Sequence, residues 1–195
     1  MDIKITKAPV LKEKPDSSIL GFGRIFTDHM FMMDYSREEG WHDARIIPFG
    51  NISLHPASTV LHYGSEIFEG LKAYRRKDGK VQLFRPTENI KRMNNSAERL
   101  CLPEDDFMQI LDTFISLEQD WVPSAEDASL YIRPFMFGND ENLGVHAVHH
   151  ATFVIILSPV GSYYKEGINP VKIMIEDKDV RAVRGGTGYA KCGGN

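Results

Sequence analysis

The residues best suited to chemistry lie in a glycine-rich segment around Lys191. Residues 185–195 read Gly-Gly-Thr-Gly-Tyr-Ala-Lys-Cys-Gly-Gly-Asn. A P-loop requires Gly-Lys-Ser/Thr, and a dinucleotide-binding turn requires Gly or Ala where Lys191 stands, so neither phosphate motif is present. Small residues let a flat ring approach the backbone, and a lysine amine can form an imine with an aldehyde. These residue types indicate pyridoxal phosphate, with an arginine for its phosphate; the alternative is a solvated lysine in a flexible glycine tail.

The strands that would position this lysine are predicted by the spacing of apolar and aromatic residues. Such residues predict a short strand over 3–6 and longer strands over 21–36, 129–138, 151–157 and 171–176. The strand over 151–157 is a continuous apolar run, which is typical of a strand buried on both faces. A strand pair over 44–54 is broken near Pro48, and Asp78-Gly79 predicts a hairpin joining 71–76 to 80–85.

Two helices are predicted between the hairpin and the later strands. The first is capped by Thr87, and its buried face carries Ile90, Met93, Ala97 and Leu100. The second is opened by Pro103 and repeats apolar residues at three- and four-residue spacing up to Val122. Strands and helices in this order predict an α+β fold.

The composition excludes several classes of protein. A chain that is 42% hydrophobic and 26% charged is neither disordered nor fibrous. Its net charge of -4 gives no attraction for nucleic acid or an anionic membrane. No apolar run approaches the ~20 residues of a membrane helix, and the first residues lack the apolar core of a signal peptide. Two cysteines are too few for a disulfide framework, which predicts a cytoplasmic protein.

The length of 195 residues exceeds the usual ~100–150 residues of one domain. Residues 158–170 hold two prolines and two glycines among few apolar residues, which is typical of a linker. We therefore expect a complete small α+β domain over 1–160, an interdomain linker over 158–170, and the incomplete start of a larger domain over 171–195.

Strings along the chain resemble, in order, those of the branched-chain aminotransferases, which are fold-type-IV pyridoxal-phosphate enzymes. They are FGRIFTDHM, LHPAS, LHYGSEIFEGLKAYR, LFRPTENIKRMNNSAERLCLP, SLYIRP, GNDENLGV and GGTGYAKCGGN. The resemblance runs from about residue 18 to the end of the chain. It implies a small N-terminal domain followed by the start of a cofactor-binding domain. It also implies a transaminase that moves the amino group of leucine, isoleucine or valine to 2-oxoglutarate.

The resemblance implies pyridoxal 5'-phosphate as cofactor and assigns residues around it. Lys191 matches the lysine that holds the cofactor as an internal aldimine and moves the substrate's α-proton. Arg92 and Arg181 match two arginines beside the cofactor phosphate, where a guanidinium forms charge-assisted hydrogen bonds. From the residues alone, the pattern favours a solvated helix residue at the edge of the apolar face for Arg92.

The resemblance also assigns a substrate pocket and a second subunit. The pocket's aromatic walls match Phe22, Tyr63, Phe68 and Tyr131. Such walls suit a branched aliphatic side chain, although aromatic residues in strands also serve as plain core. Arg133 matches the arginine for the distal carboxylate of glutamate or 2-oxoglutarate, and the period of two places it on the same strand face as Tyr131. Leu143 and Val145 match a loop that reaches the neighbouring subunit, which implies a homodimer.

Other interpretations of the sequence remain open. D-amino-acid aminotransferase and aminodeoxychorismate lyase share the fold type. Family residues that hold the cofactor ring lie beyond Asn195, so a catalytically inactive N-terminal fragment with weak cofactor binding is a further alternative. No acidic or cysteine cluster has zinc-like spacing near His146, His149 and His150, which are interpreted as loop histidines without a metal. Cys101 is expected to be buried at its helix end, and Cys192 to pack near the cofactor.

Overall fold

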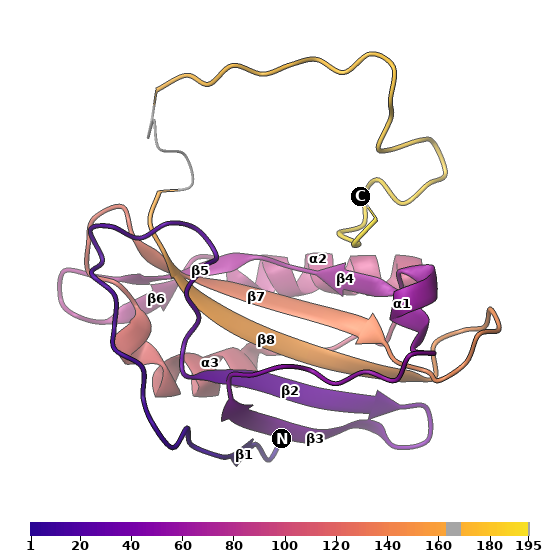
Figure 1. Cartoon of the computed structure of the whole chain (residues 1–195), viewed down its shortest axis with the longest axis horizontal. Helices are drawn as coiled ribbons and strands as arrows, with labels where there is room; N and C mark the ends of the chain where they lie inside the picture. The colour runs from indigo at the N-terminus through magenta and orange to yellow at the C-terminus, as the bar shows by residue number, and fades with distance from the viewer. Residues whose placement is uncertain (163–168, 195) are drawn as a thin grey trace.

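This computed structural model describes residues 1–162 and 169–194. Their main feature is a mostly antiparallel sheet of eight strands (Figure 1). The strand order is β1-β3-β2-β8-β7-β5-β6, and β4 pairs with β7 on the same side as β5. Only β1 and β3 pair in parallel among these strands. The strands are β1 Lys4–Ile5, β2 His29–Ser36, β3 Gly40–Pro48, β4 Glu66–Phe68, β5 Leu71–Arg75, β6 Val81–Leu83, β7 Ser129–Gly138 and β8 His150–Val160.

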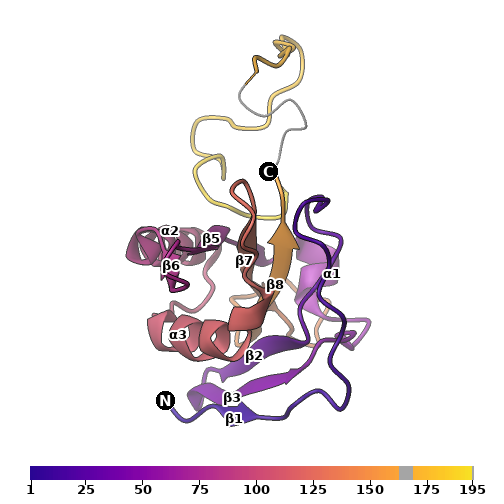
Figure 2. The ribbon, with the colours of Figure 1, turned by 90° about the vertical axis from the view of Figure 1, so that its left-hand side faces the viewer.

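Helices cover both faces of this sheet. They are α1 Thr59–Tyr63, α2 Pro86–Leu100, α3 Met108–Leu117 and the 3-10 turn η1 Gln119–Trp121. Figure 2 shows α2 and α3 on one side of β7 and β8, and α1 on the other. The main core lies under α2 and α3, and a smaller cluster that includes Phe137 and Val154 lies under Val60 of α1. None of the described helices is long and apolar enough to cross a membrane.

Several predicted elements are confirmed. The strands over 129–138 and 151–157 are β7 and β8, and β8 is buried along almost its whole length, as its continuous apolar run predicts. The predicted hairpin is β5–β6, with Gly79 at a φ of 81° in its turn. In α2 the residues Ile90, Met93 and Ala97 form the buried face.

The first helix ends at Leu100, as predicted, but the predicted starts of both helices are wrong. Arg85 and Cys101 flank α2 in the left-handed conformation, with φ of 48° and 56°, so Thr87 lies inside the helix and does not cap it. Cys101 is exposed, contrary to the expectation of burial, because it is the residue at which the chain leaves the helix. The second helix begins at Met108 and not near Pro103.

Three predicted strands differ from the structure. Residues 21–28 precede β2 without strand pairing, and the strand pair over 44–54 is only β3, which ends at Pro48. Residues 171–176 are described but form no strand; they are exposed, and a strand needs a partner to satisfy its backbone. Sequence patterns did not predict α1 or β4.

The predicted domain limits stay a prediction. β8 continues to Val160, so residues 158–160 of the predicted linker are strand. Residues 163–168 of that linker, and Asn195 of the predicted second domain, lie outside the described residues.

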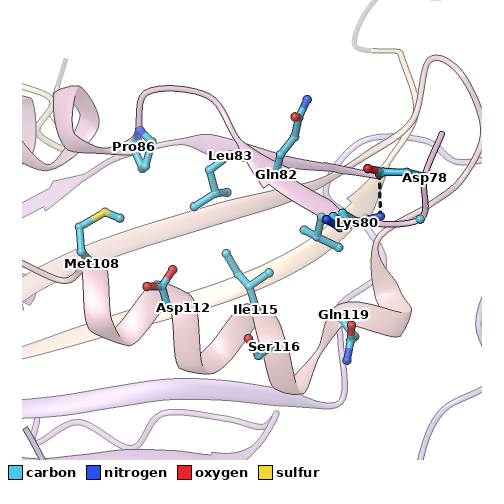
Figure 3. Close-up of a pocket in the computed structure, with 12 residues that line it drawn as sticks. Asp78, Lys80, Gln82, Leu83, Pro86, Met108, Asp112, Ile115, Ser116 and Gln119 are labelled. Atoms are coloured by element: carbon cyan, nitrogen blue, oxygen red, sulfur yellow. Dashed lines mark hydrogen bonds between the residues drawn. The ribbon is translucent and has the colours of Figure 1, made fainter. Parts of the chain in front are cut away.

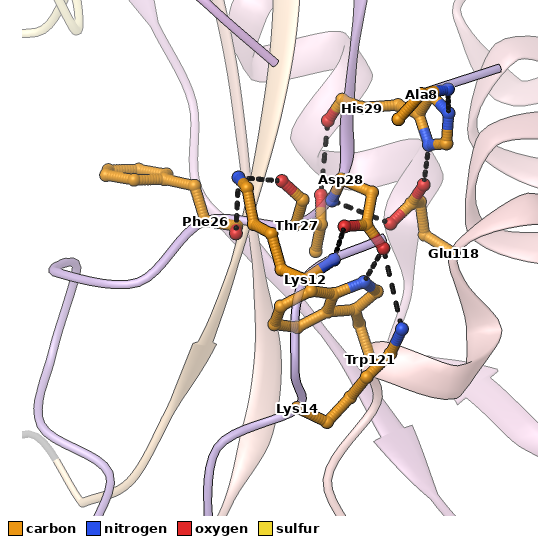
Figure 4. A network of polar contacts seen from close by, with 9 residues as sticks. All are labelled: Ala8, Lys12, Lys14, Phe26, Thr27, Asp28, His29, Glu118 and Trp121. Atoms are coloured by element: carbon orange, nitrogen blue, oxygen red, sulfur yellow. Dashed lines mark hydrogen bonds and ion pairs between the residues drawn. The ribbon is translucent and has the colours of Figure 1, made fainter. Parts of the chain in front are cut away.

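A buried polar network fastens the N-terminal arm to the sheet and to the end of α3 (Figure 4). Asp28 accepts hydrogen bonds from the Lys12 amide at 2.7 Å and from Trp121 Nε1 at 2.8 Å. His29 Nε2 accepts the Ala8 amide at 2.8 Å, so its Nδ1 carries the proton that faces buried Glu118. The network joins residues about ninety positions apart, which holds the arm against the core.

Candidate active site

Lys191 is held against the rest of the structure by its own backbone. Its N–H donates to Ser96 Oγ at 3.0 Å, and its C=O accepts the Phe68 N–H at 2.9 Å. The next residue, Cys192, is buried and pairs with Ile67 as an isolated antiparallel bridge. The segment around Lys191 therefore pairs with β4, the short strand whose other partner is β7.

The Lys191 side chain lies in a row of aromatic and cationic groups. Its Nζ stands 4.5 Å from the centre of the Phe68 ring, and the Arg133 guanidinium carbon stands 4.8 Å from the same centre. Arg133 also donates to the Tyr131 hydroxyl at 2.8 Å, and the Tyr131 and Phe22 rings form a T-shaped pair with their centres 5.1 Å apart. Five residues that the sequence assigned to one site are thus linked by direct contacts.

Tyr131 and Arg133 share a face of β7, as the period of two predicts. The Tyr131 hydroxyl also lies against Gly70, where a Cβ would come far inside the closest approach that real side chains show. Gly70 is therefore required for the position of Tyr131. Arg133 Nε is buried and has no hydrogen-bond partner among the described residues, so the site holds an unused donor beside its aromatic walls.

Arg92 is paired with Glu69, a residue that the sequence analysis did not single out. Nε and Nη2 of Arg92 donate to the two carboxylate oxygens of Glu69, the second at 3.0 Å. Glu69 also accepts hydrogen bonds from Asn89 and the Gly70 amide. Its side chain is 0% exposed, whereas that of Arg92 is 54% exposed. The pair therefore has one end in the core and the other end open to solvent.

The environment of this pair sets its charge. Burial alone would raise the pKa of Glu69, but hydrogen bonds from Arg92, Asn89 and the Gly70 amide outweigh it and hold that pKa below its usual range. The hydrogen bond to Glu69 in turn raises the pKa of Arg92. Both groups are ionised at neutral pH, so a cation with a fixed orientation faces solvent beside the Phe68 strand.

Other candidate residues lie apart from this cluster. The Tyr63 hydroxyl donates to the backbone oxygen of Leu143 in the loop after β7. The side chains of Leu143 and Val145 are exposed there. Arg181 lies in the exposed segment 171–185, and the structure brings it into no contact with the other candidates among the described residues. Arg99 of α2 donates to the Gly185 oxygen at 3.1 Å, which fastens the start of the glycine-rich segment.

His146 and His149 lie in the loop before β8, and His150 is the first residue of that strand. Asp140, His146 and His149 bring possible ligand atoms within 4.8 Å of one another, a cluster that residue spacing did not reveal. Asp140 accepts the backbone N–H groups of His149 and His150, and the Arg37 guanidinium lies 3.4 Å from His149 Nε2. These contacts hold the loop in place, and the nearby guanidinium disfavours a cation.

A groove of about 790 Å³ lies elsewhere, between the β5–β6 hairpin and α3 (Figure 3). Its walls include Lys80, Leu83, Met108, Asp112 and Ile115, and none of the predicted site residues lines it. The chemical groups gathered around Lys191 therefore define the candidate active site.

Known proteins resemble this chain along its whole length. No family model matches it. "Branched-chain-amino-acid aminotransferase 2" of Bacillus subtilis (strain 168) is 53% identical over 196 residues, which are 99% of this chain and 54% of that protein. The cytosolic branched-chain-amino-acid aminotransferase of Ovis aries is 50% identical over 198 residues, which are 100% of this chain and 51% of that protein. The chain thus spans about half the length of the curated relatives it matches.

Solved structures share the fold. The Escherichia coli branched-chain amino acid aminotransferase matches with a TM-score of 0.57 and 22% identity, over 86% of this chain and 52% of that one. The T.th. branched-chain amino acid aminotransferase, solved with pyridoxamine 5'-phosphate, matches with a TM-score of 0.54 and 24% identity, over 72% of this chain and 42% of that one. The fold is therefore the α+β fold of the fold-type-IV aminotransferases, as expected. By sequence and fold, the chain belongs to the branched-chain-amino-acid aminotransferase family.

Proposed function

We propose that the protein transfers the amino group of leucine, isoleucine or valine to 2-oxoglutarate, with pyridoxal 5'-phosphate bound to Lys191. The contact row that joins Lys191, Phe68 and Arg133 carries this proposal, because it sets an amine beside an aromatic wall and an anion-binding group. The names of the relatives support the transfer of an amino group from branched-chain amino acids.

The residues present fit the proposed cofactor. Lys191 Nζ would hold its aldehyde carbon, and the exposed guanidinium of Arg92 would hold its phosphate. Arg181 is proposed as a second phosphate arginine on the resemblance alone, because it lies in the exposed segment 171–185. Bound there, pyridoxal phosphate supplies an electron sink that weakens the Cα–H bond of the amino acid. Once the substrate's own amine has displaced it, the freed Lys191 amine, which lies 4.5 Å from the Phe68 ring centre, would take the proton from this carbon. In the second half of the reaction it would deliver a proton to the carbon of the 2-oxo acid that receives the amino group.

The proposed pocket would let two unlike substrates share one site. Phe22, Phe68 and Tyr131 of the contact row would cover a branched aliphatic side chain, which offers surface and no hydrogen bonds. Tyr63, whose hydroxyl bonds to Leu143, is proposed as a further wall on the resemblance alone. Arg133 would bind the distal carboxylate of glutamate or 2-oxoglutarate. Its buried Nε, which has no partner among the described residues, supports this role, because an unpaired buried donor costs free energy that a ligand oxygen would recover.

Further parts of the proposal concern assembly and location. A second copy of the chain would cover the exposed Leu143 and Val145, which supports a homodimer. Both cysteines are free, which supports the reducing cytoplasm. The proposed small domain spans 1–160, and 171–195 starts the cofactor-binding domain.

The test is a coupled assay. The full chain is loaded with pyridoxal phosphate and incubated with leucine and 2-oxoglutarate, and glutamate is measured. Glutamate that forms with the wild type and not with Lys191→Ala supports the proposal. If cofactor is bound and no glutamate forms, the proposed reaction is wrong. A panel of L- and D-amino acids separates the branched-chain activity from that of a D-amino-acid aminotransferase.

A further inference from the structure

Ser96 makes an unusual pair of contacts for a helical serine. It lies in α2 and is 1% exposed. Its hydroxyl donates to the Arg92 backbone oxygen at 3.0 Å, the common bond to the carbonyl four residues earlier. The same oxygen accepts the Lys191 N–H at 3.0 Å, across 95 positions of sequence. One hydroxyl therefore touches the main chains of both Arg92 and Lys191.

Few other contacts fix the position of Lys191. Its C=O bonds to the Phe68 N–H, and its neighbour Cys192 is buried. On the other side, residues 171–185 are exposed along the approach to the lysine. Ser96 is thus the one side chain, among the described residues, that bonds to the Lys191 main chain.

We propose that Ser96 is a positioning residue that sets the spacing between Lys191 and Arg92. This inference rests on the proposed function, in which the two residues bind opposite ends of one cofactor. The aldehyde and the phosphate of pyridoxal phosphate are attached to one rigid ring, so the amine and the guanidinium must lie at a matching separation. A hydroxyl bonded to both main chains holds that separation before the cofactor enters.

The contact can be tested directly by hydrogen exchange. Ser96→Ala removes the acceptor and leaves the Lys191 N–H without a partner, so its exchange in the cofactor-free full chain should become about tenfold faster or more. Ser96→Cys, which keeps the volume but is a weak acceptor, should behave like Ser96→Ala. Ser96→Thr keeps the hydroxyl and should restore slow exchange.

Cofactor affinity gives the second measurement. Binding of pyridoxal phosphate, followed by its absorbance, should be about 5- to 10-fold weaker for Ser96→Ala and Ser96→Cys, and near the wild type for Ser96→Thr. Thr113→Ala is the matched control, because Thr113 donates to the Gln109 oxygen in α3 in the same way, is only half-buried, and lies in another helix than Ser96. It should change neither exchange at Lys191 nor cofactor affinity. Circular dichroism establishes that each variant is folded.

Each outcome decides the proposal. If folded Ser96→Ala keeps both the exchange rate of the Lys191 N–H and the affinity for pyridoxal phosphate within twofold of the wild type, Ser96 has no positioning role. The proposed function is then unaffected. If Ser96→Thr is as impaired as Ser96→Ala, shape and not the hydroxyl matters, and the inference is also wrong. A wild type that binds no pyridoxal phosphate refutes the proposed function and this role together. The exchange data then still report whether Ser96 holds the Lys191 backbone.

Discussion

Removing Arg92 should destabilise the fold more than neutralising its partner. In the wild type, Glu69 is fully buried and takes two charge-assisted hydrogen bonds from Arg92. Arg92→Ala leaves a buried carboxylate with only the neutral donors of Asn89 and the Gly70 amide. Glu69→Gln instead leaves Arg92 with its charge in solvent, because that side chain is half exposed.

The size of the effect follows from these contacts. Breaking a fully buried ion pair from one side costs about 3–5 kcal/mol. Here water reaches the guanidinium and two neutral donors remain, so we expect Arg92→Ala to lower the free energy of unfolding by roughly 2–3 kcal/mol. Glu69→Gln should cost about 1 kcal/mol, and the double variant should lose less than the two single losses added together.

The stability that the Arg92–Glu69 pair contributes should depend on pH. The pKa of Glu69 is held below its ordinary value of 4.5, so the stability from the pair is complete above pH 4.5 and is lost as pH falls through the lower folded value. Without Arg92, burial dominates and the pKa of Glu69 should rise above 4.5. The difference in the free energy of unfolding between the wild type and Arg92→Ala should therefore be large at pH 7 and become smaller toward pH 4.

Urea denaturation of the wild type, both single variants and the double variant at pH 7 and pH 4 provides the measurement. Arg92→Lys serves as a control, because it keeps the positive charge and loses the planar guanidinium. Its free energy of unfolding should lie between those of the wild type and Arg92→Ala. A loss below about 0.5 kcal/mol for Arg92→Ala, or a loss equal at both pH values, would refute the reasoning from the buried carboxylate.

Three further predictions test other parts of the structure. Burial raises the pKa of Asp105 from 3.8 to about 6, so the charged form of this side chain destabilises the folded protein, and the cost is complete above pH 6. Asp105→Asn removes that charge and should raise the free energy of unfolding by roughly 1–3 kcal/mol at pH 7.5 and by little at pH 4, as measured in urea titrations. Gly70→Ala should displace the Tyr131 hydroxyl from Arg133 and raise the KM for 2-oxoglutarate about tenfold in steady-state kinetics, with an unchanged KM arguing against that pocket. Asp28→Ala leaves Trp121 Nε1 and the Lys12 amide unpartnered and should cost about 2–4 kcal/mol at pH 7 by thermal denaturation, whereas an unchanged melting temperature would show that the arm is held by other contacts.

The strands and helices that the sequence predicts well are those with local causes. Asp78-Gly79 supplies the turn of its hairpin, and the apolar run of β8 reflects burial on both faces. In contrast, β4 has only three residues, and pairing with β7 and with the Lys191 segment defines it. No pattern inside three residues can reveal such partners. The exposed segment 171–175, in which every residue but Lys172 is apolar, shows the converse, because its strand-like pattern forms no strand without a neighbour.

The residues of the candidate site also fall into two groups, those that the sequence reveals and those that only the fold brings together. The chemistry of Lys191 is visible in its glycine-rich setting, and the period of two is enough to pair Tyr131 with Arg133. Glu69 and Ser96 could not be assigned, because each acts through a residue that only the fold brings near. One signal was available for Ser96: it lies beside Ala97 on the buried part of α2, where a hydroxyl needs a hydrogen-bond partner.

The spacing along α2 connects these observations. Arg92, Ser96 and Arg99 stand four and three residues apart, which places them on one face of the helix. In order, they bond to Glu69 beside the Phe68 wall, to the Lys191 amide and to the Gly185 oxygen at the start of the glycine-rich segment. Inserting one residue between positions 92 and 96 rotates these groups about 100° apart and breaks the alignment, although the composition and apolar content of the helix hardly change. The geometry of the candidate site therefore depends on the spacing of Arg92, Ser96 and Arg99 along α2 as much as on Lys191 itself.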